Sequence, residues 1–127
     1  MLVLDTNTIV HYFKGNGRVV ERFRLESPAD VAIPAVVLYE LEVGVAGSRT
    51  RRQQIDTLMA AVRLLPFDDG AARAAADVRI ELERAGMGIG PIDTLIAGTA
   101  LAYSATLVTH NTKEFSRVRG LRIVDWY

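Results

Sequence analysis

Three acidic residues of the chain stand among apolar or small neighbours. Asp5 ends an apolar run, Glu40 lies within the mostly apolar segment 35–45, and Asp93 follows Gly90-Pro91-Ile92. Two carboxylates about 4 Å apart repel by roughly 4 kcal/mol at an effective dielectric constant near 20, so a cluster of three or four requires protons or divalent cations. Oxygen ligands completed by water favour Mg²⁺ or Mn²⁺, which polarise a phosphodiester and lower the pKa of bound water. If these acids meet in the fold, they predict metal-dependent phosphodiester hydrolysis.

Each of these acids also has a structural explanation. Asp is a preferred N-cap residue, so Asp5 taken alone is equally well explained as the cap of a helix that starts near Thr8. The residues three and four positions from Glu40 are all Val or Gly, which places Glu40 on an apolar stripe unless its carboxylate reaches water from the edge of the core. Asp93 in a first helical turn gains from the helix dipole. Asp68-Asp69 is most simply a cap and first turn.

Short apolar runs alternate with helical segments, and this order predicts an α/β fold built from parallel crossovers. We expect strands at 2–4, 31–33, 64–67, 105–108 and 121–124, and helices at 8–13, 18–25, 35–45, 49–62, 70–84 and from 91 onward. Residues 111–115 form a turn or a short helix. The strand at 64–67 belongs at an edge, because Pro66 cannot donate to a ladder. Ligands bind at the carboxyl ends of parallel strands, where Asp5 and residues 109–111 are expected.

The composition limits the kinds of protein this chain can be. Its 127 residues suit one domain, and the absence of cysteine excludes disulfides and thiolate chemistry, leaving oxygen atoms, His11 and His110 as metal ligands. The N-terminus lacks the pattern of a signal peptide, and the uncharged span 94–112 contains too many small and polar residues for a membrane helix, so a cytoplasmic location without membrane contact is expected. Fifteen basic and fifteen acidic residues give no net charge, so nucleic acid would be bound through a local patch.

Several motifs occur along the chain in a characteristic order. They are Leu4-Asp5-Thr6-Asn7, the helix around Glu40, the turn Gly90-Pro91-Ile92-Asp93, the stretch 107–115 (LVTHNTKEF) and the ending Ile123-Val124-Asp125-Trp126. In this order and spacing they resemble the PIN-domain ribonucleases and, more closely, the VapC toxins of type II bacterial toxin–antitoxin systems. The resemblance covers nearly the whole chain.

This resemblance implies a fold, an activity and partners. The fold would be a single three-layer α/β/α domain over residues 1–127, with a short, mainly parallel sheet of four or five strands and the first strand at its centre. The activity would be that of an Mg²⁺- or Mn²⁺-dependent endoribonuclease cutting exposed loops of a structured RNA such as tRNA or rRNA. The partner would be a cognate VapB-like antitoxin that presents Arg or Lys to the acidic cleft, with the toxin a homodimer or part of a higher toxin–antitoxin assembly.

The resemblance also implies roles for particular residues. Asp5, Glu40 and Asp93 would be metal ligands. The fourth acid of the family is replaced by Asn111, whose amide oxygen adds no charge, and Glu114 could serve through water if its turn is helical. Hydrogen bonds to the ligands are expected from Thr6, Asn7, Thr94 and Thr109. Phosphate contacts are expected from Arg49, Arg51, Arg52, Lys113 and Arg117, unless these form a solvated helix face or a protein-binding surface.

Two other functions compete with this interpretation. A haloacid-dehalogenase-type phosphatase also carries an Asp after its first strand, but it requires a second Asp two residues later, where this chain has Asn7. A PIN-like module that binds protein or RNA without cutting it would keep the fold and lose the chemistry. RNA cleavage that requires both metal and Asp5 would separate a nuclease from such a module.

Overall fold

The sheet at the centre of the molecule is wholly parallel. The computed structural model describes residues 1–127, and its five strands follow the order β3-β2-β1-β4-β5. The strands are β1 (Leu2–Leu4), β2 (Val31–Pro34), β3 (Arg63–Leu65), β4 (Thr106–Val108) and β5 (Arg122–Val124). The predicted α/β fold is therefore confirmed, with β1 at the centre and β3 at an edge.

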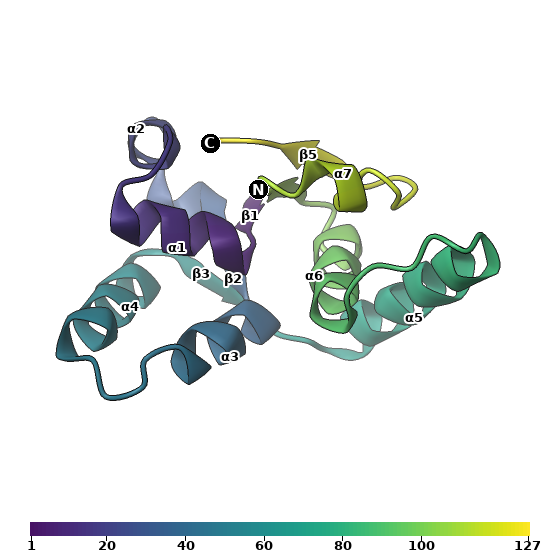
Figure 1. The fold of residues 1–127 in the computed structure, drawn as a ribbon, viewed down its shortest axis with the longest axis horizontal. Helices are drawn as coiled ribbons and strands as arrows, with labels where there is room; N and C mark the ends of the chain where they lie inside the picture. The colour runs from purple at the N-terminus through teal and green to yellow at the C-terminus, as the bar shows by residue number, and fades with distance from the viewer.

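Helices flank the sheet on both sides. They are α1 (Thr6–Lys14), α2 (Val19–Arg24), α3 (Ala35–Val43), α4 (Arg49–Ala61), α5 (Asp69–Arg84), α6 (Pro91–Ala102) and α7 (Thr112–Phe115), with a short 3₁₀ turn at Pro28–Asp30. Figure 1 shows α1, α2 and α4 to one side of the strands and α5 and α6 to the other. This arrangement gives the expected three layers. None of the helices combines the length and the apolarity that crossing a bilayer requires.

The three central strands are short and mostly buried, which explains their largely apolar sequence. All residues of β2 are buried, as are Val3, Leu4, Leu107 and Val108 of the two central neighbours. Strands buried on both faces have no polar side to alternate with. The edge strand differs from the prediction: β3 ends at Leu65, one residue before Pro66, because proline offers no N–H to extend the ladder.

The first helix also begins earlier than predicted. Helix α1 starts at Thr6 rather than near Thr8, and Asp5 is its N-cap, with a side-chain oxygen accepting from the Thr8 amide. The helix therefore follows the central strand without a loop. As a result, Thr6 and Asn7 lie in the first helical turn instead of a linker.

Helices α5 and α6 approach each other closely at Gly98. A Cβ atom placed on Gly98 would lie 2.5 Å from the backbone nitrogen, the Cα and the Cβ of Ala75. Such a distance is well inside van der Waals contact, and two packed backbones cannot yield as a flexible side chain can. The spacing of this helix pair therefore depends on the absence of a side chain at position 98.

We expect Gly98→Ala to lower the free energy of unfolding by about 1–3 kcal/mol, because the added methyl group overpacks a close helix contact. Urea denaturation followed by circular dichroism measures the change. Gly88→Ala is the matched control, since a Cβ atom there meets nothing within 4 Å. Equal stabilities of the two variants would contradict the packing that the structure shows.

Candidate active site

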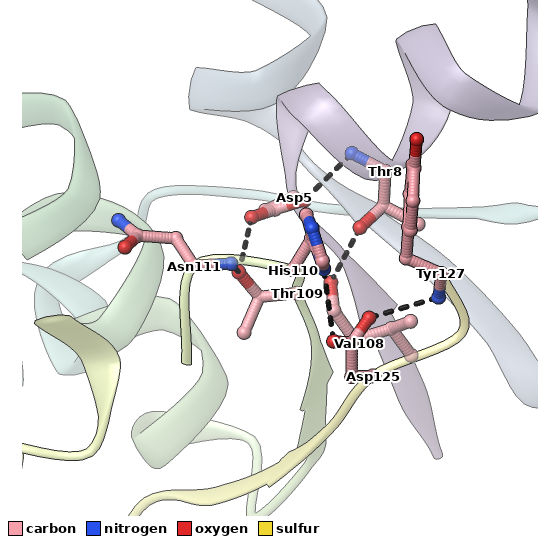
Figure 2. Close-up of polar contacts among 8 residues, drawn as sticks. All are labelled: Asp5, Thr8, Val108, Thr109, His110, Asn111, Asp125 and Tyr127. Carbon is pink, nitrogen blue, oxygen red and sulfur yellow. Dashed lines mark hydrogen bonds and ion pairs between the residues drawn. The ribbon is translucent and has the colours of Figure 1, made fainter. Parts of the chain in front are cut away.

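The Asp5 carboxylate is held by hydrogen bonds at both of its oxygen atoms. Asp5 follows the central strand and is only 4% exposed. One oxygen accepts from the Thr8 amide at 2.9 Å, and the other accepts from the Thr109 hydroxyl at 2.6 Å (Figure 2). Asp5 is thus the helix cap that one explanation required, and it is also bound across the sheet. Capping uses one oxygen, and the Thr109 hydroxyl fixes the direction of the other.

The turn after β4 meets Asp5 because of the strand register. Val108 pairs with Leu4, so Thr109 and Asp5 are the next residues on two neighbouring strands. Thr109 is fully buried, and its hydroxyl also accepts from the backbone N–H of Asn111 at 3.0 Å. The Thr109 hydroxyl therefore joins Asp5 to Asn111, and both are oriented by a single side chain.

Asn111 and Glu114 lie on the same short helix. Asn111 is the N-cap residue of α7, which confirms that this turn is helical, and its side-chain amide donates to a Glu114 carboxylate oxygen at 3.0 Å. Both side chains are partly buried. The amide oxygen of Asn111 stays free as an acceptor, since the contact with Glu114 uses the amide nitrogen.

Glu40 of α3 is held at the same end of the sheet by the first turn of α1. The Thr6 hydroxyl donates to a Glu40 carboxylate oxygen at 2.5 Å, and Thr6 immediately follows Asp5. Glu40 is half-buried on α3. A single turn of α1 therefore connects the acid at the end of β1 with the acid on α3.

The pKa of Asp93 is raised, and the other acids contribute to the rise. Burial in the first turn of α6 raises its pKa from 3.8 to about 6, and repulsion from Asp5, Glu114 and Glu40 adds to the rise. The first turn of a helix would favour the charged form. Here burial and three like charges outweigh that effect, so these four carboxylates share one electrostatic environment.

The donor atoms suit a hard divalent cation, although the carboxylates are turned toward protein hydrogen-bond donors. No three His, Asp or Glu side chains converge on a common point at ligand distance. Mg²⁺ retains several waters and usually binds one or two carboxylates directly, so the remaining acids can act through water. All of the available donors are oxygens, and the mutual repulsion felt at Asp93 is what a cation would relieve. On both counts the residues fit Mg²⁺ or Mn²⁺.

Comparison with known proteins identifies the family. The profile of the PIN domain matches residues 2–121. This chain belongs to the PIN-domain family. It is similar to the tRNA(fMet)-specific endonuclease VapC of Shigella flexneri, with 37% identity over 98% of this chain and 96% of the relative, and to the protein of that name from Salmonella typhimurium, with 34% identity over the same shares. These relatives place it among the VapC-type nucleases of the family.

A solved structure gives the same result. The chain matches a structure of VapBC2 from Rickettsia felis bound to a DNA fragment from their promoter with a TM-score of 0.91 and 32% identity, covering 99% of this chain and 98% of that one. The fold expected from the resemblance is confirmed. Membership of the PIN family also removes the haloacid dehalogenase alternative.

The other predicted polar residues of this PIN domain lie in several different settings. Thr94 is buried, but its hydroxyl donates to the Gly90 carbonyl of its own helix at 3.0 Å rather than to an acid. Asn7 is exposed. Of the four threonine and asparagine positions expected near the ligands, Thr6 and Thr109 are the two that contact acids.

The predicted phosphate-binding residues are only partly available. Arg52 forms ion pairs with Glu42 and Asp56, and the Arg117 guanidinium donates to the Gly88 carbonyl at 3.3 Å. Arg51 lies with its guanidinium carbon 4.9 Å from the centre of the Phe13 ring, and one of its terminal nitrogens is buried without a hydrogen-bond partner. Arg49 and Lys113 are exposed and enter no ion pair.

The structure also brings together a group that the sequence analysis did not identify. Asp125 accepts from the Tyr127 backbone N–H at 2.8 Å and contacts the His110 Nδ1 at 2.9 Å (Figure 2). Burial raises the pKa of Asp125, but these hydrogen bonds and the nearby His11 lower it overall. The rule that located Asp5 would have found this group, because His110 and Asp125 each follow one of two adjacent parallel strands.

We predict that the metal-free protein loses stability as the pH rises from about 4 to about 6.5. Asp93 binds its proton more tightly when folded, so its contribution is complete below 3.8 and disappears as the pH passes through about 6. Because Asp93 is partly exposed, we expect about 1 kcal/mol. Urea denaturation in EDTA across this range measures the loss, which Asp93→Asn should remove and Asp77→Asn, an exposed control, should keep. The same pH slope in Asp93→Asn would contradict the assignment.

Proposed function

We propose that this chain is the toxin of a toxin–antitoxin pair and cleaves RNA with the help of Mg²⁺ or Mn²⁺. One observation carries the proposal: Asp5, Glu40, Asp93 and Glu114 come from four different parts of the chain, yet the charges of the other three add to burial in raising the pKa of Asp93. A fold that only needed stability would not gather four like charges at one end of its sheet. The family assignment supports nuclease chemistry at this place.

Each acid has a distinct part in this proposal. Asp5 is a rigid ligand, because Thr8 and Thr109 hold its carboxylate. Glu40, held by the Thr6 hydroxyl, and Asp93 would be the other ligands, and Asp93 would have to be deprotonated to bind the ion. A bound cation supplies the Lewis acid that polarises the phosphodiester and makes water a stronger nucleophile. The chain offers no cysteine and requires no side-chain nucleophile.

Asn111 and Glu114 together take the place of the family's fourth acid. The Asn111 amide oxygen is an acceptor without charge, and Glu114 sits beside it as a second carboxylate. We propose that Glu114 acts through water and that Asn111 orients it. The site then carries four carboxylates even though the usual acid after β4 is absent.

The substrate we propose is an exposed, unpaired segment of a structured RNA. Unpaired loops let a protein splay the backbone and reach the bases, whereas the major groove of an RNA duplex is too narrow for side chains. The names of the Shigella and Salmonella relatives specify a tRNA, which favours a tRNA loop over rRNA. The exposed side chains of Arg49 and Lys113 are the cations we assign to phosphates.

The partner we propose is a VapB-like antitoxin, and the toxin we propose is a homodimer that also enters a larger complex with it. The solved structures from Rickettsia felis and Salmonella typhimurium are both VapBC complexes bound to DNA. We call Asp5, Glu40, Asp93 and Glu114 the acidic cluster. An Arg or Lys of the antitoxin would enter this cluster, where its charge lowers the same repulsion that a metal would. Inhibition then follows from competition for the site.

We expect Asp5→Asn, Glu40→Gln and Asp93→Asn each to lower the rate of RNA cleavage at least 100-fold, because each removes a ligand charge with little change of shape. Excess EDTA should abolish cleavage by the wild type, and added Mg²⁺ or Mn²⁺ should restore it. Sequencing the new RNA ends in lysate measures the activity and locates the cut. Glu42→Gln is the matched control, since Glu42 lies on the same helix but is exposed and paired with Arg52.

A wild type that cuts equally well in EDTA would overturn the metal-dependent mechanism. A wild type that binds RNA but never cuts it would instead identify the chain as a binding module.

We expect expression of this chain alone to arrest bacterial growth, and co-expression of the neighbouring reading frame to relieve the arrest. The reason is competition between an antitoxin cation and the metal for the acidic cluster. Colony counts after induction measure the effect, with Asp5→Asn as the inactive control. A wild type that neither arrests growth nor binds the neighbouring product would show that the toxin assignment is wrong.

A further inference from the structure

Two aromatic rings lie stacked beside the acidic cluster. The His110 and Tyr127 ring centres are 4.2 Å apart and their planes differ by 21°. His110 directly follows Thr109, whose hydroxyl binds Asp5, so the stack begins within one residue, about 3.8 Å of chain, of that contact. In Figure 2 the two rings stand on the side of Asp5 away from Asn111. We call this pair the aromatic stack.

Several contacts fix the aromatic stack in place. The Asp125 carboxylate binds both members, contacting the His110 ring with one oxygen and the Tyr127 amide with the other. His11 of α1 lies edge-on to Tyr127, with ring centres 4.8 Å apart and planes at 70°. The stack is therefore formed by the turn after β4 and the tail after β5, and α1 supports it through His11.

The tail itself is anchored without the Tyr127 ring. The Trp126 side chain is buried, and the Tyr127 carbonyl accepts from the Arg18 backbone N–H at 2.9 Å. Gly17, at φ +59°, lets the tail approach so closely that a Cβ there would lie 2.6 Å from the Tyr127 carbonyl oxygen. Because these contacts already hold the tail, packing alone does not explain why it presents an aromatic ring.

Both rings remain accessible to a ligand. The His110 side chain is 50% exposed, and Tyr127 is 47% exposed. A rigid, half-exposed pair of flat rings is the kind of surface on which an unpaired base stacks, and such stacking adds affinity whatever the base. Stacking also needs no cation, which matters beside four carboxylates that repel phosphate.

We propose that the aromatic stack of His110 and Tyr127 binds an unpaired nucleobase of the RNA beside the acidic cluster. The inference rests on the proposed ribonuclease function and adds a base-binding site to it. His110 and Tyr127 contact the base, while Asp125 and His11 are positioning residues. Lys14, three residues after His11 on the same face of α1 and in no ion pair, is placed to meet the adjoining phosphate.

The test is RNA binding in an Asp93→Asn background, which prevents cutting. The probe is a single-stranded RNA hexanucleotide that carries 2-aminopurine, whose fluorescence is quenched by stacking, at one central position. We expect quenching on binding. Two variants that lose a ring, His110→Gln and Tyr127→Leu, should remove the quenching and raise the dissociation constant about 10-fold. His110→Gln keeps a polar side chain. Tyr127→Phe keeps the ring and should bind within about twofold of the parent.

Two controls make the outcome decisive. Tyr103→Leu removes an aromatic ring about 15 Å along α6 from Asp93 and should leave binding unchanged. Thermal unfolding identifies any variant that fails to fold. If Tyr127→Leu unfolds, His110→Gln and Tyr127→Phe decide the question alone. Ring-removing variants that quench and bind like the parent would overturn the inference, as would variants that lose antitoxin binding but keep RNA binding.

The failure of this inference and the failure of the proposed function can be told apart. Gel analysis of wild-type reactions shows whether RNA is cut at all. Cutting without quenching overturns the base-binding site and leaves the ribonuclease standing. A wild type that neither binds nor cuts RNA overturns both.

Discussion

The hydrogen bonds at the Asp5 carboxylate connect the main parts of this structure. The carboxylate caps α1 by accepting from the Thr8 amide. It also joins the central strand to the turn after β4 by accepting from the Thr109 hydroxyl. The Thr8 hydroxyl in turn donates to the Val108 carbonyl at 3.1 Å, which is a second hydrogen bond between α1 and the end of β4. A buried carboxylate with both oxygens bonded is held in one orientation, which suits the proposed role of Asp5 as a metal ligand.

The acidic cluster is a local concentration of charge in a chain that has none overall. Four acids meet at one end of the sheet, and the burial and repulsion that raise the pKa of Asp93 show the cost of bringing them there. The fold tolerates this because the site lies at the carboxyl ends of the strands, where water, a metal or a partner's cation can reach it. The same repulsion is the physical basis of both the proposed metal binding and the proposed inhibition by a basic antitoxin residue.

The tail after β5 completes this end of the molecule. Trp126 packs into the core, and Asp125 and Tyr127 on either side of it face the turn that carries His110. The parallel order of β4 and β5 makes this possible, because two chain segments that leave the same edge of a sheet remain neighbours. The acids attract cations, and the stacked rings beside them offer a flat aromatic surface for uncharged groups. Together they suit a substrate with an anionic backbone and flat bases.

Local sequence patterns were enough to predict the class of fold and to single out Asp5, Glu40 and Asp93 as the acids of interest. Both follow from local chemistry: which residues are apolar, and where a charge lies on an apolar stripe. The sequence placed helix and strand ends only to within a few residues, since capping by Asp5 moved the start of α1 to Thr6.

Which groups meet depends on the tertiary structure. The hydrogen bonds from Thr6 to Glu40 and from Thr109 to Asp5 join residues 34 and 104 positions apart. Arg52, a predicted phosphate ligand, is instead paired with Glu42. Local patterns predict burial, but they do not contain strand order and register. Those two properties bring the ends of β1, β4 and β5 together, and with them the acids, the threonines and the aromatic stack.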